Sequence, residues 1–529
     1  MAMNQETQAA RRYHQATKHS PMSVRQSGHS MDWANKPNPF KNYPDLEVIP
    51  LPQDLPKTGV PALEAIGKTE VRGSEEAVPE LAQVAYVLYY SAGITKKMVF
   101  PGESIYFRAA ACAGALYPIE IYLVCGDIPG LEAGVYHFSP ADFGLRQLRR
   151  GDYREALARA SGDETQVERA PAVLVFTAIT CRSSWKYGAR SYRYHFWDAG
   201  MILANCLAAS AAQALPRKVV MGFVDRTVDH LLGIDGAHEK SLALLPLGWT
   251  SKPPPPAPGD IPELHLAVEP LSREQVDYPP IDEVHQASML EDSESVKRWR
   301  ESRFAGKPKN HEAERYPLRP MEASNYPEKA IEAVILERGS SRRFREEAIS
   351  FEELSTMLEL AIAGFPADWR DTWDDLMNDL YINVHAVDNL AAGAYYLHRR
   401  EKSLVILGEG DFRHHSAHLC LGQPLGGTSG ATAFYLADLE AILETYGNRG
   451  YRLAQLEAGI IGGMLYLAAY ALGRGATGLT FFDDDVVDFF LPANAREEAI
   501  FVTALGEPAG PLQQRGKLVR MNPGDPVKY

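Results

Sequence analysis

Residues 445–484 read TYGNRGYRLAQLEAGIIGGMLYLAAYALGRGATGLTFFDD, and this segment decides the fold. Its apolar run at 459–472 is rich in glycine and alanine, which predicts a buried helix that a second helix approaches closely. We expect this helix to end near Gly473, because further glycines follow, and we expect residues 479–482 to form a buried strand. Taken alone, the segment would also fit an ordinary core helix.

The same pattern occurs earlier, at residues 186–225, as KYGARSYRYHFWDAGMILANCLAASAAQALPRKVVMGFVD. Identical residues recur at a constant separation of 259 positions, and the register continues upstream to Gly134 and Gly393. So long a register indicates a duplicated domain, and it predicts a tandem pair rather than a solenoid of short repeats. In the first copy the shared residues of this segment are Tyr187, Gly188, Arg190, Tyr192, Arg193, Ala199, Gly200, Ile202, Phe223 and Asp225.

Composition narrows the class of protein. The chain has 529 residues, 45% of them hydrophobic, which suits two domains with full cores. A net charge of −14 argues against nucleic-acid binding, because phosphate backbones require a basic surface. The five cysteines form no Cys-x-x-Cys pair, so we expect neither a metal site nor a disulfide framework. The N-terminal residues lack the apolar core of a signal peptide, and the longest apolar run is too short for a bilayer, so we expect a cytoplasmic protein without a membrane partner.

We divide the chain into four parts. Residues 1–61 are polar and proline-punctuated and are expected to form an extended arm anchored by aromatic side chains. Residues 62–249 form the first domain, 250–326 a proline-rich and charged linker, and 327–529 the second domain with a short tail. Helical and β-rich stretches alternate in both domains, which predicts an α+β fold.

The two copies differ where the residues suit chemistry. The second copy opens with Arg338, Ser340 and Arg342 just ahead of a helix, and two forked donors around a hydroxyl suit a phosphate. A solvated basic turn is the alternative for so short a motif. The first copy has Glu70 at the comparable place, and a carboxylate there would repel a phosphate.

The first copy in turn keeps a feature that the second has lost. Residues 108–118 form a loop of small residues closed by proline, which allows backbone to approach a flat ligand. At the same offset the second copy is bulky and acidic, and it has Thr445 where the first has Lys186, next to Tyr187. If each ligand site lies between the halves, one composite site keeps every feature and the other loses them all. We therefore expect one surviving site.

On these residues the chain resembles a tandem member of the nitroreductase-like flavoprotein family, closest to the SagB-type peptide dehydrogenases that oxidise azolines to azoles. The resemblance implies two domains, each an antiparallel-rich sheet flanked by helices, packed as an intrachain pseudo-dimer that binds FMN at the interface. The branch has Pro-Ser where this chain has Ala111 and Cys112, so a thiol replaces a hydroxyl near the flavin.

The resemblance also implies roles for individual residues. Lys186 and Tyr187 match the pair implicated in catalysis, and the helix-to-strand turn at 478–481 would place backbone near flavin N5. Tyr187 would act as acid or base if Lys186 lowered its pKa, although a surface turn is the alternative for this pair. The implied FMN-binding residues are Arg338, Ser340, Arg342, Ala111, Cys112, Ala113, Gly114, Ala115, Gly478, Leu479, Thr480, Phe481 and, after the last strand, Arg515 and Lys517.

The sequence therefore predicts an FMN-dependent oxidoreductase that accepts a hydride at flavin N5 from an azoline-containing peptide or similar small substrate. One alternative is a nitro- or quinone-type reductase that uses NAD(P)H as donor. A second is a non-catalytic flavin- or peptide-binding partner of a modification complex. NAD(P)H or oxygen is the expected redox partner.

Overall fold

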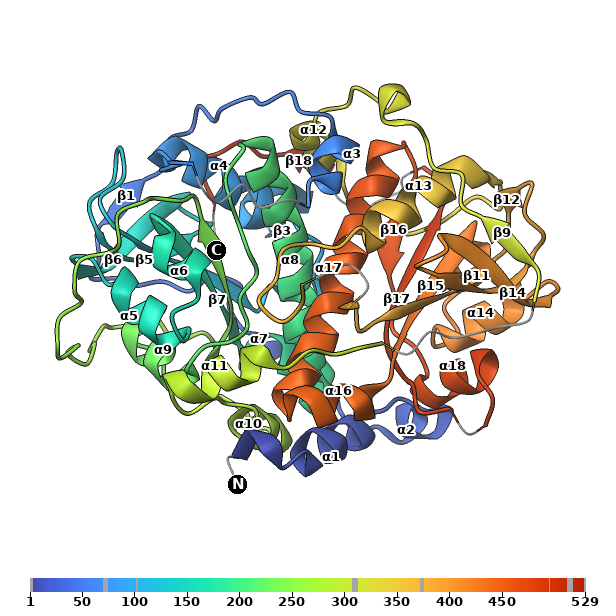
Figure 1. Ribbon diagram of the computed structural model, residues 1–529, viewed down its shortest axis with the longest axis horizontal. Coiled ribbons are helices and arrows are strands. Elements are labelled where there is room, and N and C mark those ends of the chain that lie inside the picture. Colours follow the sequence, from blue (N-terminus) through green and yellow to red (C-terminus); the bar gives the residue numbers. More distant parts are fainter. Residues whose placement is uncertain are drawn as a thin grey trace.

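The computed structural model describes residues 3–69, 75–100, 103–306, 313–371, 375–493, 495–510 and 517–527. Two halves lie side by side, each with one large sheet covered by helices (Figure 1). Their long helices, α8 (Ser191–Ala212) and α17 (Arg449–Ala471), cross in the centre of the molecule. The predicted α+β duplication is confirmed.

Both large sheets are antiparallel and share one strand order. The first sheet runs β1-β6-β5-β4-β7-β8. Read from the matching edge, the second runs β9-β14-β13-β11-β15-β17 and adds β16 at the end. The first comprises β1 (Val48–Pro50), β4 (Ile119–Cys125), β5 (Gly134–Ser139), β6 (Gly144–Arg150), β7 (Ala172–Ile179) and β8 (Glu239–Leu247). The second comprises β9 (Arg315–Pro317), β11 (Asp379–Val384), β13 (Gly393–His398), β14 (Ser403–Glu409), β15 (Ala431–Ala437), β16 (Gly475–Gly478) and β17 (Glu498–Gly506).

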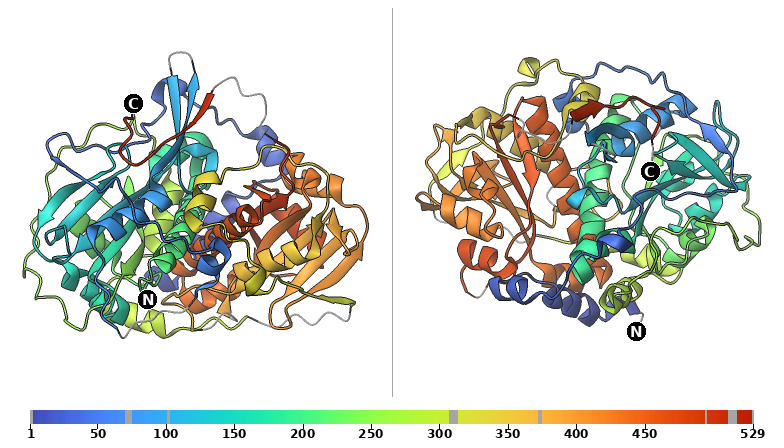
Figure 2. Two further views of the ribbon diagram at one scale, coloured as in Figure 1. Left: turned by 90° about the horizontal axis from the view of Figure 1, so that it is seen from above. Right: turned by 180° about the vertical axis from the view of Figure 1, so that it is seen from behind.

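Two small sheets and shorter helices complete the molecule. The projecting hairpin β2 (Ile94–Phe100) and β3 (Glu103–Arg108) pairs with β18 (Lys517–Arg520) from the end of the chain (Figure 2). β10 (Ile349–Ser350) pairs with β12 (Val387–Asp388). The helices beside the two long ones include α1 (Gln8–Ala16), α2 (Pro21–Gln26), α3 (Ala62–Gly67), α4 (Leu81–Ala92), α5 (Arg154–Ala160), α6 (Thr165–Arg169), α7 (Thr180–Tyr187), α9 (Asp225–Leu232), α10 (Pro279–Ala287), α11 (Ser293–Glu301), α12 (Ile331–Glu337), α13 (Phe351–Ile362), α14 (Arg413–Leu419), α15 (Leu425–Thr428), α16 (Leu439–Tyr446) and α18 (Asp483–Phe490).

Small residues allow the backbones of α8 and α17 to touch. A Cβ atom on Gly459 would lie 2.6 Å from the carbonyl oxygen of Trp197, and one on Gly200 would lie 2.6 Å from the carbonyl carbon of Gly459. This is the close helix crossing that the glycine-rich run predicts. α17 is long and apolar enough to cross a membrane, but 94% of its apolar window is buried inside the protein. It is the central helix of a globular core.

The strand after α17 differs from the prediction. β16 occupies Gly475–Gly478 and pairs with β17, whereas residues 479–482 have no strand structure. They leave the sheet edge and turn toward the other half, where the ring of Phe481 lies 6.2 Å from that of Trp197. The prediction of a strand at 479–482 is wrong because four small residues, rather than the apolar ones, continue the ladder.

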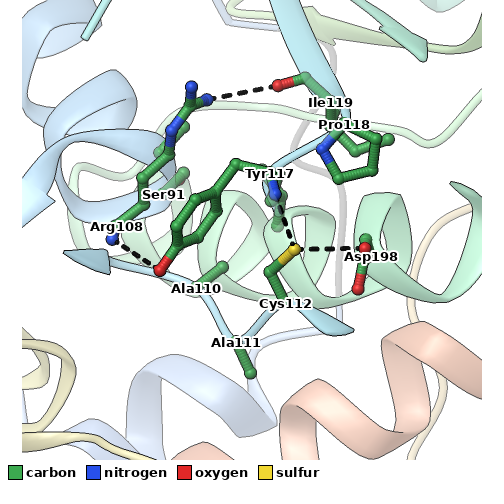
Figure 3. A pocket seen from close by; sticks show the side chains of 11 residues that line it. Ser91, Arg108, Ala110, Ala111, Cys112, Tyr117, Pro118, Ile119 and Asp198 are labelled. Atoms are coloured by element: carbon green, nitrogen blue, oxygen red, sulfur yellow. Dashed lines mark hydrogen bonds between the residues drawn. The ribbon is translucent and has the colours of Figure 1, made fainter. Parts of the chain in front are cut away.

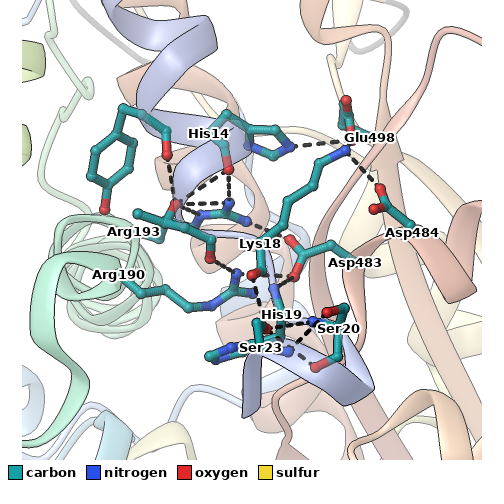
Figure 4. Close-up of polar contacts among 12 residues, drawn as sticks. His14, Lys18, His19, Ser20, Ser23, Arg190, Arg193, Asp483, Asp484 and Glu498 are labelled. Atoms are coloured by element: carbon teal, nitrogen blue, oxygen red, sulfur yellow. Dashed lines mark hydrogen bonds and ion pairs between the residues drawn. The ribbon is translucent and has the colours of Figure 1, made fainter. Parts of the chain in front are cut away.

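Arginines of each central helix pair with an aspartate from the other half. Arg190 and Arg193 bind Asp483 at 2.9 and 2.6 Å (Figure 4), and Arg449 and Arg452 bind Asp225 at 2.7 and 2.6 Å. The structural partner of Asp225 is therefore Asp483 and not Asp484. The constant offset of 259 slips to 258 after the central helix, because the second copy is one residue shorter there.

The arm and the linker take equivalent places. Arg193 donates to the carbonyl of His14 at 2.8 Å and to Thr17 Oγ1 at 3.0 Å, both from the arm. Arg452 donates to the carbonyl of His285 at 2.8 Å and to Ser288 Oγ at 2.7 Å, both from the linker. β1 and β9 likewise occupy matching sheet edges. The arm and linker segments thus belong to the duplication as well.

Aromatic anchoring of the arm holds in part. Phe40 and Tyr43 are buried, as expected for residues that fix the arm to the first domain. Trp33 is 67% exposed; its ring contacts Trp185 edge-on, with centroids 5.1 Å apart, and Lys36 Nζ lies 5.8 Å from its centre.

Candidate active site at the seam of the two halves

The small-residue loop of the first copy is held from beneath by α8. Asp198 on α8 accepts a hydrogen bond from the Ala113 N–H at 2.8 Å and faces the thiol of Cys112 at 3.2 Å (Figure 3). The Tyr117 N–H points at the same sulfur at 3.1 Å. Gly114 adopts a φ of +62°, which glycine reaches without strain. The loop is therefore a rigid backbone surface.

The predicted catalytic pair lies against this loop. A Cβ atom on Gly114 would lie 2.7 Å from the hydroxyl of Tyr187 and 3.2 Å from the Nζ of Lys186. The Tyr187 ring stacks on Tyr194 of α8, with centroids 4.2 Å apart and planes at 14°. Lys186 Nζ lies 5.3 Å from the centre of the Tyr187 ring. The loop and the pair, 72 positions apart in the sequence, thus form one surface.

Burial sets the protonation of the groups around the loop. It raises the pKa of Tyr187, and nearby Tyr194 and Asp198 raise that pKa further. The condition that Lys186 lowers the pKa of Tyr187 is therefore not met, and the phenol keeps its proton at neutral pH. Burial also raises the pKa of Asp198 to about 7 and that of the Cys112 thiol well above its usual range. Cys112 is consequently a thiol and not a reactive thiolate.

The arginine motif of the second copy reaches across the seam. Arg338 is buried, and its Nε donates to the carbonyl of Ala109 in the first copy at 2.9 Å. The N–H of Ser341 donates to Ala476 of β16 at 2.9 Å, which fixes the motif to the sheet. Ser340 Oγ lies 3.3 Å from the hydroxyl of Tyr466, while Arg342 is exposed. Arg338 and Ser340 are therefore placed at the seam, and Arg342 lies at its rim.

Two further cations at this place were not found from the sequence. Lys96 of β2 donates to the carbonyls of Glu337 and Arg338, and Arg520 of β18 is its register partner. Burial lowers the pKa of Lys96 to about 8, and the charges of Arg338 and Arg520 contribute. Lys517 lies three residues from Arg520 and so points to the opposite face of the small sheet. Arg515, like Glu70 of the first copy, lies outside the described residues.

The turn of the second copy faces the loop across the seam. The Gly478 N–H donates to the hydroxyl of Tyr466 at 2.5 Å, and the Leu479 N–H donates to Val502 at 3.3 Å. Among the described residues, the buried hydroxyl oxygens of Thr480 and Ser341 have no hydrogen-bond partner. Since buried polar atoms are normally paired, these two are free for a ligand.

A bound FMN, the cofactor that the resemblance implies, fits this donor set. Lys96 and Arg338 are partly or fully buried cations whose hydrogen bonds go to carbonyl oxygens rather than to carboxylates, and Ser341 offers a free hydroxyl beside them. Such a set suits a phosphate. The cavity lined by the loop and α8 holds only about 10 Å³, enough for one water and too small for a flavin ring (Figure 3).

In the pseudo-symmetric counterpart of this site, the bulky loop takes the place of the small-residue loop, and a cavity of about 620 Å³ lies beside it, lined by Thr69, Lys218, residues 363–367, Arg370 and Asp371. The carboxylate of Asp368 accepts hydrogen bonds from the N–H groups of Met221 and Gly222, at 2.9 and 2.8 Å. The Thr480 amide corresponds to one of these two, whereas the Leu479 N–H donates to Val502 as the Val220 N–H donates to Leu244. Residues 366–368 also pair with Val219, which brings the two copies into direct backbone contact. A carboxylate from the bulky loop thus occupies the position that stays open in the other site.

Comparison with known proteins agrees with this architecture. The Nitroreductase family model matches residues 74–249 and 335–507, and the chain belongs to this family. A crystal structure of a nitroreductase-like protein from Anabaena variabilis has a TM-score of 0.75 at 26% identity, and the match covers 95% of this chain and 99% of that one. The tandem arrangement therefore recurs over the whole length of a second protein.

Two sequence relatives point to different chemistries. The nitroreductase-like protein MJ1384 of Methanocaldococcus jannaschii is 27% identical over 205 residues, which cover 39% of this chain and 93% of the relative. The trifolitoxin-processing protein TfxB of Rhizobium leguminosarum bv. trifolii is 30% identical over 206 residues, 36% of this chain and 54% of TfxB. The matched region thus spans about half the length of TfxB.

Proposed function

We propose that the protein is an FMN-dependent oxidoreductase of the SagB type that oxidises an azoline ring in a peptide to an azole. The observation that carries the proposal is the contrast between the two seam sites: one keeps the loop, the Lys186–Tyr187 pair and the cationic pocket, and in the other the Asp368 carboxylate binds the backbone amides of Met221 and Gly222. The name of TfxB, a toxin-processing protein, supports a peptide substrate. We place the reaction in the cytoplasm, in keeping with the free cysteines.

Residues from both copies would hold the cofactor. Arg338, Ser341 and Lys96 would bind the phosphate, and the Thr480 hydroxyl and the loop around Gly114 would face the ring. When bound, FMN supplies a two-electron acceptor for a hydride from the substrate. Asp198 keeps the loop in shape through the Ala113 N–H.

The paired side chains divide the proton chemistry. Oxidation of an azoline removes one hydride and one proton, so the site needs a proton acceptor. Tyr187 keeps its own proton, because burial raises its pKa, and its hydroxyl therefore donates a hydrogen bond that orients the substrate. Lys186 lies beside it against Gly114, and we assign to Lys186 the transfer of the substrate proton.

Reconstitution tests the cofactor directly. Purified protein incubated with FMN should show a flavin absorbance spectrum at one FMN per chain, because one seam site keeps the small-residue loop with the buried Arg338 and the other has a bulky, acidic loop in its place. Colourless protein, or two FMN per chain, would contradict the proposal.

Two substitutions test the catalytic pair. With an azoline peptide as substrate, Lys186→Ala should lower kcat by 100-fold or more and Tyr187→Phe by about 10-fold, in the range usual for acid–base groups. Lys97→Ala on β2 is a matched control and should leave kcat unchanged. Unchanged turnover in both variants of the pair would remove their assigned roles.

The relationship to MJ1384 favours a second candidate, an NAD(P)H-dependent nitro- or quinone-type reductase. Anaerobic mixing of the FMN-loaded protein separates the two candidates. Bleaching of the flavin by an azoline peptide supports the dehydrogenase, whereas rapid bleaching by NADPH alone supports the reductase. A flavin that neither donor reduces would favour a non-catalytic partner of a modification complex.

A further inference from the structure

An exposed segment of the arm, residues 20–35, has an unusual composition for its surroundings. We call it the arm strap. Residues 22–34 are all exposed, yet they include Met22, Val24, Met31 and Trp33. Trp33 is 67% exposed and Met31 is 37% exposed. Apolar side chains that gather on an exposed surface mark binding sites, so the strap is a candidate for one.

One end of the strap is fixed beside the flavin turn of the second copy. The His19 N–H donates to Asp483 Oδ2 at 2.8 Å, and the Asp483 N–H donates back to the carbonyl of His19 at 3.0 Å (Figure 4). Asp483 is buried and follows Phe481 by two residues. The strap therefore begins where one wall of the candidate site ends.

The other end is fixed beside the catalytic pair of the first copy. The indole N–H of Trp185 donates to the carbonyl of Asp32 at 2.7 Å, and His29 Nε2 lies 3.0 Å from the carbonyl oxygen of Trp185. The ring of Trp33 meets that of Trp185 edge-on at 5.1 Å. Trp185 immediately precedes Lys186 and Tyr187. The strap thus spans the seam from one wall of the site to the other.

We propose that the arm strap is a peptide-binding surface, on which Met31 and Trp33 take apolar side chains of the substrate next to the ring that is oxidised. This inference rests on the proposed function. The Trp33 ring is positioned by its contact with Trp185 and by Lys36, whose Nζ lies 5.8 Å from the ring centre, so it loses little further freedom on binding. Its exposed part offers an apolar area next to Trp185, the residue that precedes the Lys186–Tyr187 pair, and exposed aromatic rings of this kind anchor peptides in hot spots.

The apolar character of the strap specifies the occupant. Burial of Trp33 and Met31 against leucine-like side chains would stabilise the complex, whereas glycine offers no side chain for them to pack against. A small azoline without flanking residues would reach the pair but not the strap. The substrate class is therefore a peptide with apolar residues beside its azoline, rather than a free heterocycle.

Binding of labelled peptides tests the strap independently of turnover. The probe is a fluorescein-labelled octapeptide with one thiazoline flanked by leucines, titrated into FMN-loaded protein and followed by anisotropy. We expect wild-type protein to bind it at least 10-fold more tightly than the same peptide flanked by glycines. Trp33→Ala should remove this difference, Met31→Ala should reduce it, and Trp33→Phe should keep it within about threefold.

Controls separate the strap from the rest of the protein. Val48→Ala removes an exposed apolar side chain on β1, at the outer edge of the first sheet, and should change nothing. FMN absorbance should be the same in every variant, because Trp33 is exposed and does not touch the cofactor site.

Three outcomes would overturn the inference: equal affinity for both peptides, equal binding by Trp33→Ala and wild type, or a strap that instead mediates association. The last would appear as a loss of dimer mass in light scattering on Trp33→Ala. If FMN binds and the leucine peptide binds through Trp33 but is never oxidised, the proposed reaction fails while the strap remains a peptide site. If FMN does not bind, the proposed function fails before the strap is tested, and anisotropy on the FMN-free protein decides the strap alone.

Discussion

The two seam sites share the same framework of helices and sheets, but they differ in the side chains that line them. In the open site, Ala109 and Ala111 line the loop and Gly478 borders the turn. In the closed site, the same register positions carry Asp368 and Arg370, both buried. Around both, the central helices and their Arg–Asp pairs are preserved. Duplication thus kept the scaffold of two sites and filled one of them with side chains.

The loops of the two sites are also held in the same way. Asp198 of α8 accepts from the Ala113 N–H, and Glu457 at the equivalent position of α17 accepts from the N–H groups of Met377 and Asn378, at 2.7 and 3.0 Å. A closed site that still supports its loop is a structural element and not a decayed remnant. The closed half therefore contributes stability, while the open half contributes chemistry.

The largest effect should follow from breaking the framework that both sites share. Asp483→Asn and Asp225→Asn each leave two buried arginines without a carboxylate, which costs about 3–5 kcal/mol of unfolding free energy for a broken buried pair. Chemical denaturation should show similar losses for the two, because the networks are equivalent. Asp484→Asn, which removes an exposed partner of Lys18, should cost less than about 1 kcal/mol. Unequal losses at 483 and 225 would contradict the equivalence.

The next effect comes from converting the open site into a closed one. Ala109 occupies the register position of Asp368, so Ala109→Asp should place a carboxylate on the turn amides around Thr480 and beside Arg338. FMN affinity should fall by 100-fold or more, measured by quenching of flavin fluorescence, while circular dichroism stays that of the wild type. Ala109→Ser adds a hydroxyl without charge and should lose less than 10-fold. Full FMN binding by Ala109→Asp would show that the cofactor does not use these amides.

The repeat in the sequence was sufficient to predict the duplication, the seam and the partners of the loop. It did not reveal the slip from 259 to 258, because one missing residue after α17 leaves the flanking identities at Phe482 and Asp484 in apparent register. Only the contacts of Arg190 and Arg193 identify Asp483 as the partner. Where one copy is a residue shorter, residues that are identical in the aligned sequences are therefore not always the ones that occupy equivalent places in the structure.

Other features depend on distant strands and on burial. Lys96 and Arg520 are 424 positions apart and meet only because β18 crosses to β2. The raised pKa of Tyr187 follows from burial and from stacking on Tyr194, neither of which its neighbour Lys186 indicates. One signal was available in the sequence. The arm contains His14-Gln-Ala-Thr and the linker contains the similar His285-Gln-Ala-Ser, and this match would have indicated that the arm and the linker belong to the repeat.

A smaller effect is expected from opening the closed site. Asp368→Ala leaves the buried N–H groups of Met221 and Gly222 without acceptors, which should cost about 2 kcal/mol of unfolding free energy. The flavin content should stay at one FMN per chain, because the bulky loop with Trp369 and Arg370 remains in place of the small-residue loop. A second FMN in this variant would mean that Asp368 alone closes the site.

The smallest expected effect is a pH dependence of stability, and it arises from Asp198, which supports the loop of the open site. Burial raises the pKa of Asp198 from its ordinary 3.8 to about 7, so between these values the folded protein holds a proton that the unfolded chain has released. Stability from this group is therefore present at low pH and is lost as pH rises toward 7; between pH 6 and 7 the loss is about 1 kcal/mol. Asp198→Asn keeps an oxygen for the Ala113 N–H but does not titrate, so its unfolding free energy relative to wild type should rise by that amount over the same interval. Glu457→Gln is the matched change in the closed half. A constant difference between Asp198→Asn and wild type from pH 5 to 8 would show that Asp198 is already ionised in the folded protein.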